Sequence, residues 1–463
     1  MRTSFGPMLI VLLILYCGCA LAQTDTGTSD TGPKPAYTFP DDTGAPQTGP
    51  KPAFTYPDAT PSLDFLNGAV ENSSITLGIG AGVSYISNTY SVTNSQDRWV
   101  YHVTPSISIQ QFRPTVSWNL SYAGGWQHYT QPSGVSNGSN NLFSQNVGAG
   151  LRWQMARRWQ LAATDHFTYS ANPFDSYITQ AGIPTMNNPN PVTYYPLTSF
   201  TSNIGVMSLT NQLSKVDTLA FTGTTSLRRT STYNLLTVPF YNLVSYGGRA
   251  SYAHRFSPRL TLGADYNYNS LDFGHGQQRS GVQTISMTVD YLIRPNMTIS
   301  GWIGPEHTGT QTTILGVRLP HDSMWSAAGG VNFGWQSLRN SFVAGFIRQV
   351  TDGGGIIATS QINSVSAGYH RKLTQKMDLS LGAAYFHDVS TTVSSRTYDH
   401  SSISAGLSYK LAKSLSATAQ YGYLHQSQSN AFLSPGLLGA GATYSANFVG
   451  CSINYTWSHP LGR

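Results

Sequence analysis

Residues 75–85 read ITLGIGAGVSY, and every second residue of this stretch is apolar while the residues between are small or polar. A period of two is the pattern of a β-strand with one apolar and one polar face. The same pattern returns in residues 260–268, 377–385 and 415–423. We therefore expect an all-β protein, and a soluble sandwich would show the same alternation as a barrel.

The composition narrows the class of protein. Only 10% of the 463 residues are charged, against about 25% in an average soluble protein. Mean hydropathy is nevertheless −0.20, which is too low for a helical membrane protein. A β-rich chain that is neutral outside and polar inside has the composition of a membrane β-barrel. An extracellular β-repeat protein, such as a β-helix or an adhesin, is the alternative at this point.

Two kinds of connection alternate along the chain. Eight short turns contain proline or basic residues, and the longer connections between them are rich in Ser, Thr, Asn and Gly. Short turns on one side and long loops on the other are typical of bacterial membrane barrels, and eight such turns predict about 18 strands. The turns are Phe112–Pro114, Met155–Arg158, Ser214–Asp217, Phe256–Arg259, Arg294–Asn296, Gln336–Asn340, Leu373–Lys376 and Ala412–Ser414.

Aromatic residues on the apolar face fall at two heights. One set stands beside the short turns and the other seven to ten residues away, about the height of a bilayer's apolar band. The first set is Trp153, Trp159, Tyr252, Tyr291, Trp335, Tyr369, Tyr409 and Trp457, and the second is Tyr85, Tyr169, Tyr268, Tyr385 and Tyr423. Two such rings predict the aromatic girdles of a membrane barrel.

The last alternating stretch, Val449 to Trp457, ends in an aromatic residue. It resembles the C-terminal assembly signal of outer-membrane proteins, and this implies recognition by the barrel-assembly machinery. With the other features, it makes the chain resemble the porin-like outer-membrane barrels, without matching a specific transporter family. The resemblance implies an antiparallel up-and-down transmembrane β-barrel over residues 74–457, in contact with outer-membrane lipid, and a C-terminal tail over 458–463.

The first 22 residues have the pattern of a Sec signal peptide. Arg2 precedes an apolar run, and Ala20-Leu21-Ala22 fits a cleavage site before Gln23. A lipoprotein signal that uses Cys19 is the alternative reading. Export to the outer membrane of a Gram-negative envelope is the expected localisation.

Residues 23–73 predict a disordered, proline-rich periplasmic spacer. TGPKPAYTFPD at 31–41 recurs as TGPKPAFTYPD at 48–58. The segment is either a plain tether or a docking peptide for a periplasmic partner. The docking residues would be Tyr37, Phe39, Phe54 and Tyr56.

A barrel of about 18 strands is wide enough to enclose an aqueous lumen. The expected function is therefore diffusion of small hydrophilic solutes through an outer-membrane channel. Strand parity predicts these charged residues on the lumen face: Arg152, Arg228, Arg249, Asp265, Asp290 and Asp378. Asp165 falls on the apolar parity of its strand, which only a bulge or a register error would explain.

The third long connection, residues 172–200, far exceeds the others. In porins the third outer loop often folds into the lumen, so the resemblance implies a constriction here; a long exposed loop is the alternative. The constriction candidates are Asp175, Tyr177, Tyr194 and Tyr195.

Other functions are less well supported by the residues. Neither HExxH, paired histidine ligands nor GxSxG occurs, so we expect no enzyme, no metal and no cofactor. Neighbouring acid and histidine residues point to opposite faces of a strand, as in Glu306-His307, His387-Asp388 and Asp399-His400. Basic residues at the short turns fit anchoring beside lipid phosphates rather than nucleic acid. An export-linked barrel, for example in exopolysaccharide secretion, is the alternative function, and a homo-oligomer is compatible with either.

Overall fold

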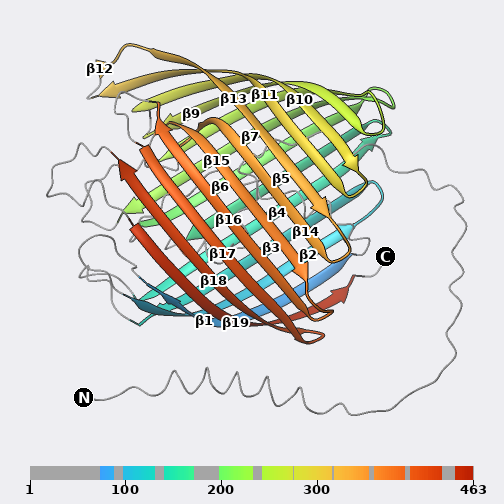
Figure 1. Ribbon diagram of the computed structural model, residues 1–463, viewed down its shortest axis with the longest axis vertical. Coiled ribbons are helices and arrows are strands. Elements are labelled where there is room, and N and C mark those ends of the chain that lie inside the picture. The colour runs from blue at the N-terminus through green and yellow to red at the C-terminus, as the bar shows by residue number, and fades with distance from the viewer. Residues whose placement is uncertain are drawn as a thin grey trace, which may run out of the picture. The chain divides into compact units, whose positions relative to one another are not determined.

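A computed structural model describes residues 73–87, 97–130, 140–170, 198–232, 242–274, 276–314, 317–353, 359–391, 397–429 and 444–461. These residues form one antiparallel sheet of tilted strands that curls round until its first and last strands meet (Figure 1). The strands are β1 (Ser74–Ile86), β2 (Arg98–Phe112), β3 (Val116–Tyr129), β4 (Asn141–Ala156), β5 (Trp159–Ser170), β6 (Thr198–Gln212), β7 (Asp217–Thr232), β8 (Leu243–Arg255), β9 (Leu260–Phe273), β10 (Gln278–Arg294), β11 (Met297–Ile314), β12 (Val317–Arg318), β13 (Asp322–Gln336), β14 (Asn340–Thr351), β15 (Ser360–Lys372), β16 (Met377–Ser390), β17 (Thr397–Ala412), β18 (Leu415–Ser429) and β19 (Tyr444–Pro460).

Eighteen of the 19 strands form the barrel wall, because the two-residue β12 pairs only with the end of β11 in the described part of the chain. Each wall strand pairs with the next wall strand along the chain, so β11 pairs directly with β13. The wall closes where β1 pairs with β19, from Ser74↔Pro460 to Ile86↔Phe448. The predicted fold class and strand number are thereby confirmed.

The last strand is longer than the sequence predicted. β19 continues past Trp457 to Pro460, because the first residues of β1 supply ladder partners for it. The Thr76 hydroxyl donates to Ser458 Oγ at 3.2 Å, and the Leu461 N–H donates to the Ser73 carbonyl at 2.8 Å. Residues 458–460 therefore belong to the barrel rather than to a tail.

All eight short turns lie at one end of the barrel, together with the start of β1 and the end of β19. We call this the turn end, and the opposite one the loop end. The ladder shifts register at Gln154/Ala156, Leu292/Arg294 and Lys410/Ala412. These shifts sit beside turns, so the strands keep the same side chains facing inward along their bodies.

Burial is inverted relative to a soluble protein. On the outside, Met287 and Ile303 are 72% and 69% exposed, whereas Ser286 and Thr308 on the inside are only 2% exposed. An apolar outer face with a polar inner face is the pattern of a barrel surrounded by lipid. No helix long and apolar enough to cross a bilayer occurs in the described ranges.

The aromatic residues of both predicted girdles lie on the outer face. Several tyrosine hydroxyls donate to carboxylates near the strand ends: Tyr252 to Asp217 at 2.7 Å, at the turn end, and Tyr385 to Asp399 at 2.6 Å, at the loop end. A ring with an apolar body and a hydrogen-bonded tip suits the boundary between hydrocarbon and water.

We expect Met287→Lys to destabilise the barrel by about 2–4 kcal/mol, the cost of a cation on the lipid face near the bilayer midplane. Reversible urea unfolding into lipid vesicles, followed by tryptophan fluorescence, measures this. Met287→Leu is the matched control and should change stability little. A lysine variant as stable as the leucine variant would contradict an outer face in contact with lipid.

Candidate functional site in the barrel lumen

The inner face of β1 is a strip of bare backbone. Gly78, Gly80 and Gly82 face inward, whereas Leu77 and Ile79 between them face outward. A Cβ at Gly80 would lie 2.5 Å from Asn454 Oδ1 and 2.6 Å from Thr104 Oγ1. The glycines thus leave room for side chains from both neighbouring strands to lie over the β1 backbone.

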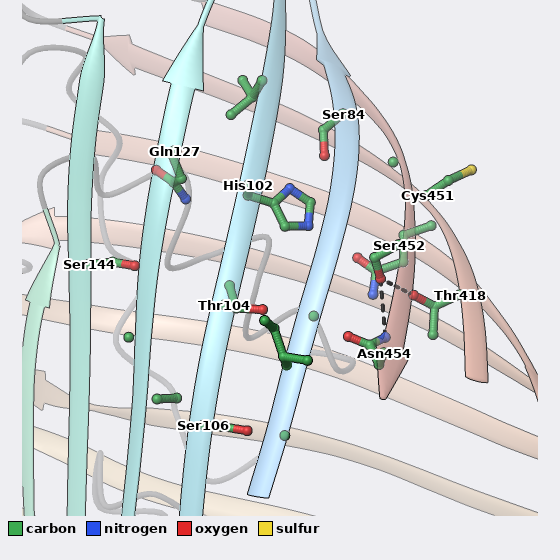
Figure 2. A pocket seen from close by; sticks show the side chains of 18 of the residues that line it. Ser84, His102, Thr104, Ser106, Gln127, Ser144, Thr418, Cys451, Ser452 and Asn454 are labelled. Carbon is green, nitrogen blue, oxygen red and sulfur yellow. Dashed lines mark hydrogen bonds between the residues drawn. The ribbon is translucent and has the colours of Figure 1, made fainter. Parts of the chain in front are cut away.

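A cavity of about 650 Å³ lies over this strip. In Figure 2, His102, Thr104 and Ser106 follow one another along β2 on one side of β1, and Ser452 and Asn454 stand on β19 on the other. β3, β4, β5 and β18 complete the lining. We call this cavity the trough; its polar lining includes His102, Thr104, Gln127, Asn146, Ser452 and Asn454.

Charged residues lie on a different part of the inner wall. On β8 and β9, Arg249 Nη2 lies 2.9 Å from Asp265 Oδ2, and both side chains are nearly buried. On β15 and β16, His370 Nε2 lies 3.6 Å from Asp378 Oδ1. The structure thus brings the predicted lumen residues Arg249 and Asp265 together as a pair and leaves Asp378 with a neighbouring histidine.

The remaining predicted lumen residues lie on three other strands. Arg152 of β4 donates to Gln160 Oε1 at 3.2 Å, close to the turn end. Asp290 of β10 shares the inner parity of the buried Ser286 and Thr288. Arg228 of β7 lies near the loop end and contacts a distant part of the chain.

That distant part is the loop end of the β14–β15 hairpin, which leaves the wall and enters the lumen. β14 pairs with β13 only as far as Arg348↔Gly329, but with β15 as far as Thr351↔Ser360. Just beyond, Asp352 Oδ2 lies 3.1 Å from Arg228 Nη2. β7 and β14 are separated in the wall by β8, β9, β10, β11 and β13, so this ion pair spans part of the lumen.

Further contacts hold the hairpin inside. The Thr359 hydroxyl lies 2.8 Å from Ser280 Oγ on β10. Glu306 of β11, only 2% exposed, accepts a hydrogen bond from the Val350 N–H at 3.0 Å. Val350 also joins an apolar cluster with Leu243, Leu271, Phe273 and Val282. The described residues therefore narrow the lumen with the β14–β15 hairpin.

Sequence reasoning considered Glu306 only as half of an adjacent pair with His307 and missed its role as an acceptor inside the lumen. A usable signal was present, since Glu306 has the same parity as the inward-facing Thr308 and Thr310. The inward bend of the hairpin had no comparable signal, because it depends on residues contributed by five other strands.

Several predicted functional residues lie outside the described residues. They are the constriction candidates Asp175, Tyr177, Tyr194 and Tyr195 and the docking candidates Tyr37, Phe39, Phe54 and Tyr56. One boundary of the constriction loop was wrong: residues 198–200 belong to β6 and pair with β7, so the third connection ends at residue 197.

Two histidine–aspartate pairs lie on the outer face. His254 Nδ1 is 2.7 Å from Asp217 Oδ1, and His387 Nδ1 is 2.8 Å from Asp399 Oδ1. Each aspartate also accepts a hydrogen bond from a girdle tyrosine, so these pairs stabilise the edge of the membrane belt. Within the described ranges, no three His, Cys, Asp or Glu residues are grouped so as to hold a metal ion.

Three solved structures are similar in fold. Acinetobacter baumannii OccAB4 has 8% identity and a TM-score of 0.41, over 84% of this chain and 98% of that one. Pseudomonas aeruginosa OpdK with vanillate has 12% identity and a TM-score of 0.41, over 85% and 100%. The FrpB iron transporter of Neisseria meningitidis has 10% identity and a TM-score of 0.42, over 85% and 82%. No family model and no curated protein matches the sequence.

Likenesses at this level carry no argument about function. The closed strand pairing, the apolar outer face and the two aromatic girdles carry the assignment themselves. The chain is an outer-membrane β-barrel in contact with lipid, and the polar inner wall is its candidate functional surface.

The two faces of the wall predict opposite reactivity towards a charged, water-soluble thiol reagent. In liposomes, Ser106→Cys in a Cys451→Ala background should react, because residue 106 lines the trough. Cys451, exposed on the outer face of β19, and Ile79→Cys should not react until the protein is unfolded in urea. Equal labelling of Ser106→Cys and Ile79→Cys in liposomes would contradict the assigned faces. The chain used should lack residues 1–22, so that Cys17 and Cys19 are absent.

Proposed function

We propose that this protein is a passive channel through which small hydrophilic solutes diffuse across the outer membrane. The observation that carries the proposal is the combination of a closed 18-strand wall with a polar inner face. A wall of this circumference encloses more space than its own side chains fill, and polar groups keep that space hydrated. The trough is one part of that space.

In the proposed channel, the β14–β15 hairpin sets the width of the path that solutes take through the lumen. It is held by the Arg228–Asp352 ion pair and by Thr359, which lies 2.8 Å from Ser280 Oγ and accepts from Gln278 Nε2 at 3.3 Å. These contacts are polar and lie outside the strand ladders, so removing them should loosen the hairpin, which Val350 also anchors, without unfolding the wall. No step requires a nucleophile or a cofactor, in keeping with a role that is not enzymatic.

In planar bilayers, the purified full chain should give discrete conductance steps. Asp352→Ala combined with Thr359→Ala should give larger and less steady steps, because the hairpin loses its attachment to β7 and β10. Asp272→Ala is the matched control: it removes an ion pair with Arg279 at 3.0 Å between neighbouring strands and should leave the steps unchanged. Absence of conductance from a barrel whose folding is verified by heat-modifiable gel migration would overturn the channel.

Three further roles are proposed from the sequence. We propose that residues 1–22 direct Sec export, that 23–73 form a periplasmic spacer and that the barrel-assembly machinery recognises β19. The duplicated motif at 31–41 and 48–58 supports a periplasmic partner and, with it, the alternative of an export-linked barrel. Conductance that survives deletion of residues 31–58 would favour the channel over that alternative.

We also propose that the barrel forms a homo-oligomer through the outer faces of β5 to β8. Asp165 lies on the outer face of β5, between the girdle residues Trp159 and Tyr169, and no register shift lies next to it in either ladder. Asn203 Nδ2 donates to both oxygens of Asp165, at 3.2 and 3.1 Å. A carboxylate in the hydrocarbon region is costly, and a protein–protein contact would remove it from lipid.

Small residues beside Asp165 would allow close approach of a second copy. Gly205 pairs with Asp165 on one side and with Thr225 on the other, and Gly223 pairs with Gly248 nearby. A Cβ added at Gly223 or Gly248 would meet nothing within 4 Å. At these glycines the outer surface is therefore open, and at Asp165 it is polar.

Asp165→Leu should shift the protein in nanodiscs from an oligomer to a monomer, because it removes the polar group that the contact shields from lipid. Chemical cross-linking and mass photometry measure the shift, and Met287→Leu on another part of the outer face serves as control. An unsubstituted protein that is monomeric in the bilayer would rule out the oligomer.

A further inference from the structure

Most charged residues of the inner wall lie away from the trough, although Arg98 of β2 and Arg152 of β4 also have inner parity. The ion-paired lumen residues Arg228, Arg249, Asp265 and Asp352 lie on β7, β8 and β9 and next to β14. Glu306, Asp378 and Asp388 lie on β11 and β16. By contrast, no Asp, Glu, Lys or Arg occurs among the described residues that line the trough, which are contributed by β18, β19 and β1 to β5.

The trough nevertheless carries many groups able to form hydrogen bonds. Gln127 lines it although the residue is only 5% exposed. Asn146 Oδ1 is buried and accepts no hydrogen bond from the described protein groups. Amides and hydroxyls both donate and accept, and an imidazole does so when neutral. Such a surface can therefore satisfy a partner that also does both.

Some of the lining groups are already oriented by one another. The Thr418 and Ser452 hydroxyl oxygens lie 2.6 Å apart, and Asn454 Nδ2 donates to Ser452 Oγ at 3.3 Å (Figure 2). His166 Nε2 lies 3.1 Å from Thr168 Oγ1. These bonds fix side chains at the edges of the trough, so a solute meets groups with settled positions.

The loop end of the trough is apolar. Ile86, Val100 and Phe448 line it there and are buried together with Tyr129 and Leu424. At the floor, polar side chains of β2 and β19, such as Thr104 and Asn454, lie over the glycines of β1. A neutral polar wall beside an apolar patch suits a molecule with hydroxyl groups around a carbon ring, because such a ring has both kinds of surface.

We propose that the trough is a binding site for uncharged polyhydroxylated solutes, such as small saccharides and polyols. The proposal rests on the channel function and specifies the class of solute that the channel favours. A hydroxylated ring exchanges its hydrogen bonds with water for bonds to the amides and hydroxyls of the wall. A charged solute loses hydration on entering the trough without meeting an opposite charge, so it binds there less well.

The test uses three solutes of one size in planar bilayers at about pH 8, where an unperturbed imidazole is neutral. They are glucose, which is uncharged, gluconate, which is an anion, and glucosamine with a fully methylated amino group, which is a permanent cation. Glucose should reduce the ionic current in a saturable way, and gluconate should do so much more weakly. Methylated glucosamine bearing a permanent positive charge should behave like gluconate.

Two isosteric substitutions place a carboxylate in the trough, Asn146→Asp and Gln127→Glu. Each should raise the glucose concentration that gives half-maximal block about two- to tenfold. This is the effect expected when one hydrogen-bonding amide is replaced and the site becomes charged. Asp290→Asn, on the inner face of β10 away from the trough, should leave glucose binding unchanged. Heat-modifiable migration verifies that each variant is folded.

The outcomes separate this inference from the channel itself. No conductance from a folded barrel would overturn the channel, whatever the solute. Conductance that glucose does not saturate, or that gluconate blocks as strongly as glucose, would leave the channel and overturn the proposed selectivity. Glucose block that is lost equally in Asp290→Asn would place the site on the charged part of the wall and also overturn it.

Discussion

Hydrocarbon offers no hydrogen-bond partner to the backbone, and the rest of the structure depends on this constraint. A sheet in a bilayer cannot have a free edge, so β1 must pair with β19, as it does from Ser74 to Ile86. Antiparallel closure between these strands requires an even number of strands in the wall and brings the two ends of the barrel chain to one side. The alternating pattern then follows, because one face of each strand contacts lipid and the other faces the lumen.

The fold could be predicted in detail because its signals are local. Period-two alternation gives the faces, the short turns give the strand number, and register shifts occur only beside turns. Residues 297–308 alternate poorly because β11 places the large Trp302 inward, against Ala328, and the small Gly301 and Pro305 outward. The end of β19 was misjudged because pairing with residues at the other end of the sequence, rather than its own pattern, extends it.

The candidate site was only partly predictable, for the same physical reason. Parity alone put Arg249 and Asp265 on one face, and adjacent strands then brought them together. The Arg228–Asp352 pair joins strands that are not neighbours in the wall, and no pattern in either segment indicates it. The trough depends on closure, since its glycine floor on β1 lies between β2 and β19. Asp165, which seemed to require an irregular strand, sits in a regular one and marks a polar place on the outer surface.

The seam between β1 and β19 also bears on how a cell can distinguish finished barrels from unfinished ones. β1 is synthesised first and its closing partner β19 is synthesised last. A chain that ends before β19 therefore lacks the native partner for the free edge of β1. A message cut short, or a chain clipped before Tyr444, would leave the edge of β1 that pairs with β19 open to other strands and to proteases. Closure of the wall therefore depends on a complete last strand, because β19 supplies every ladder partner on that edge of β1.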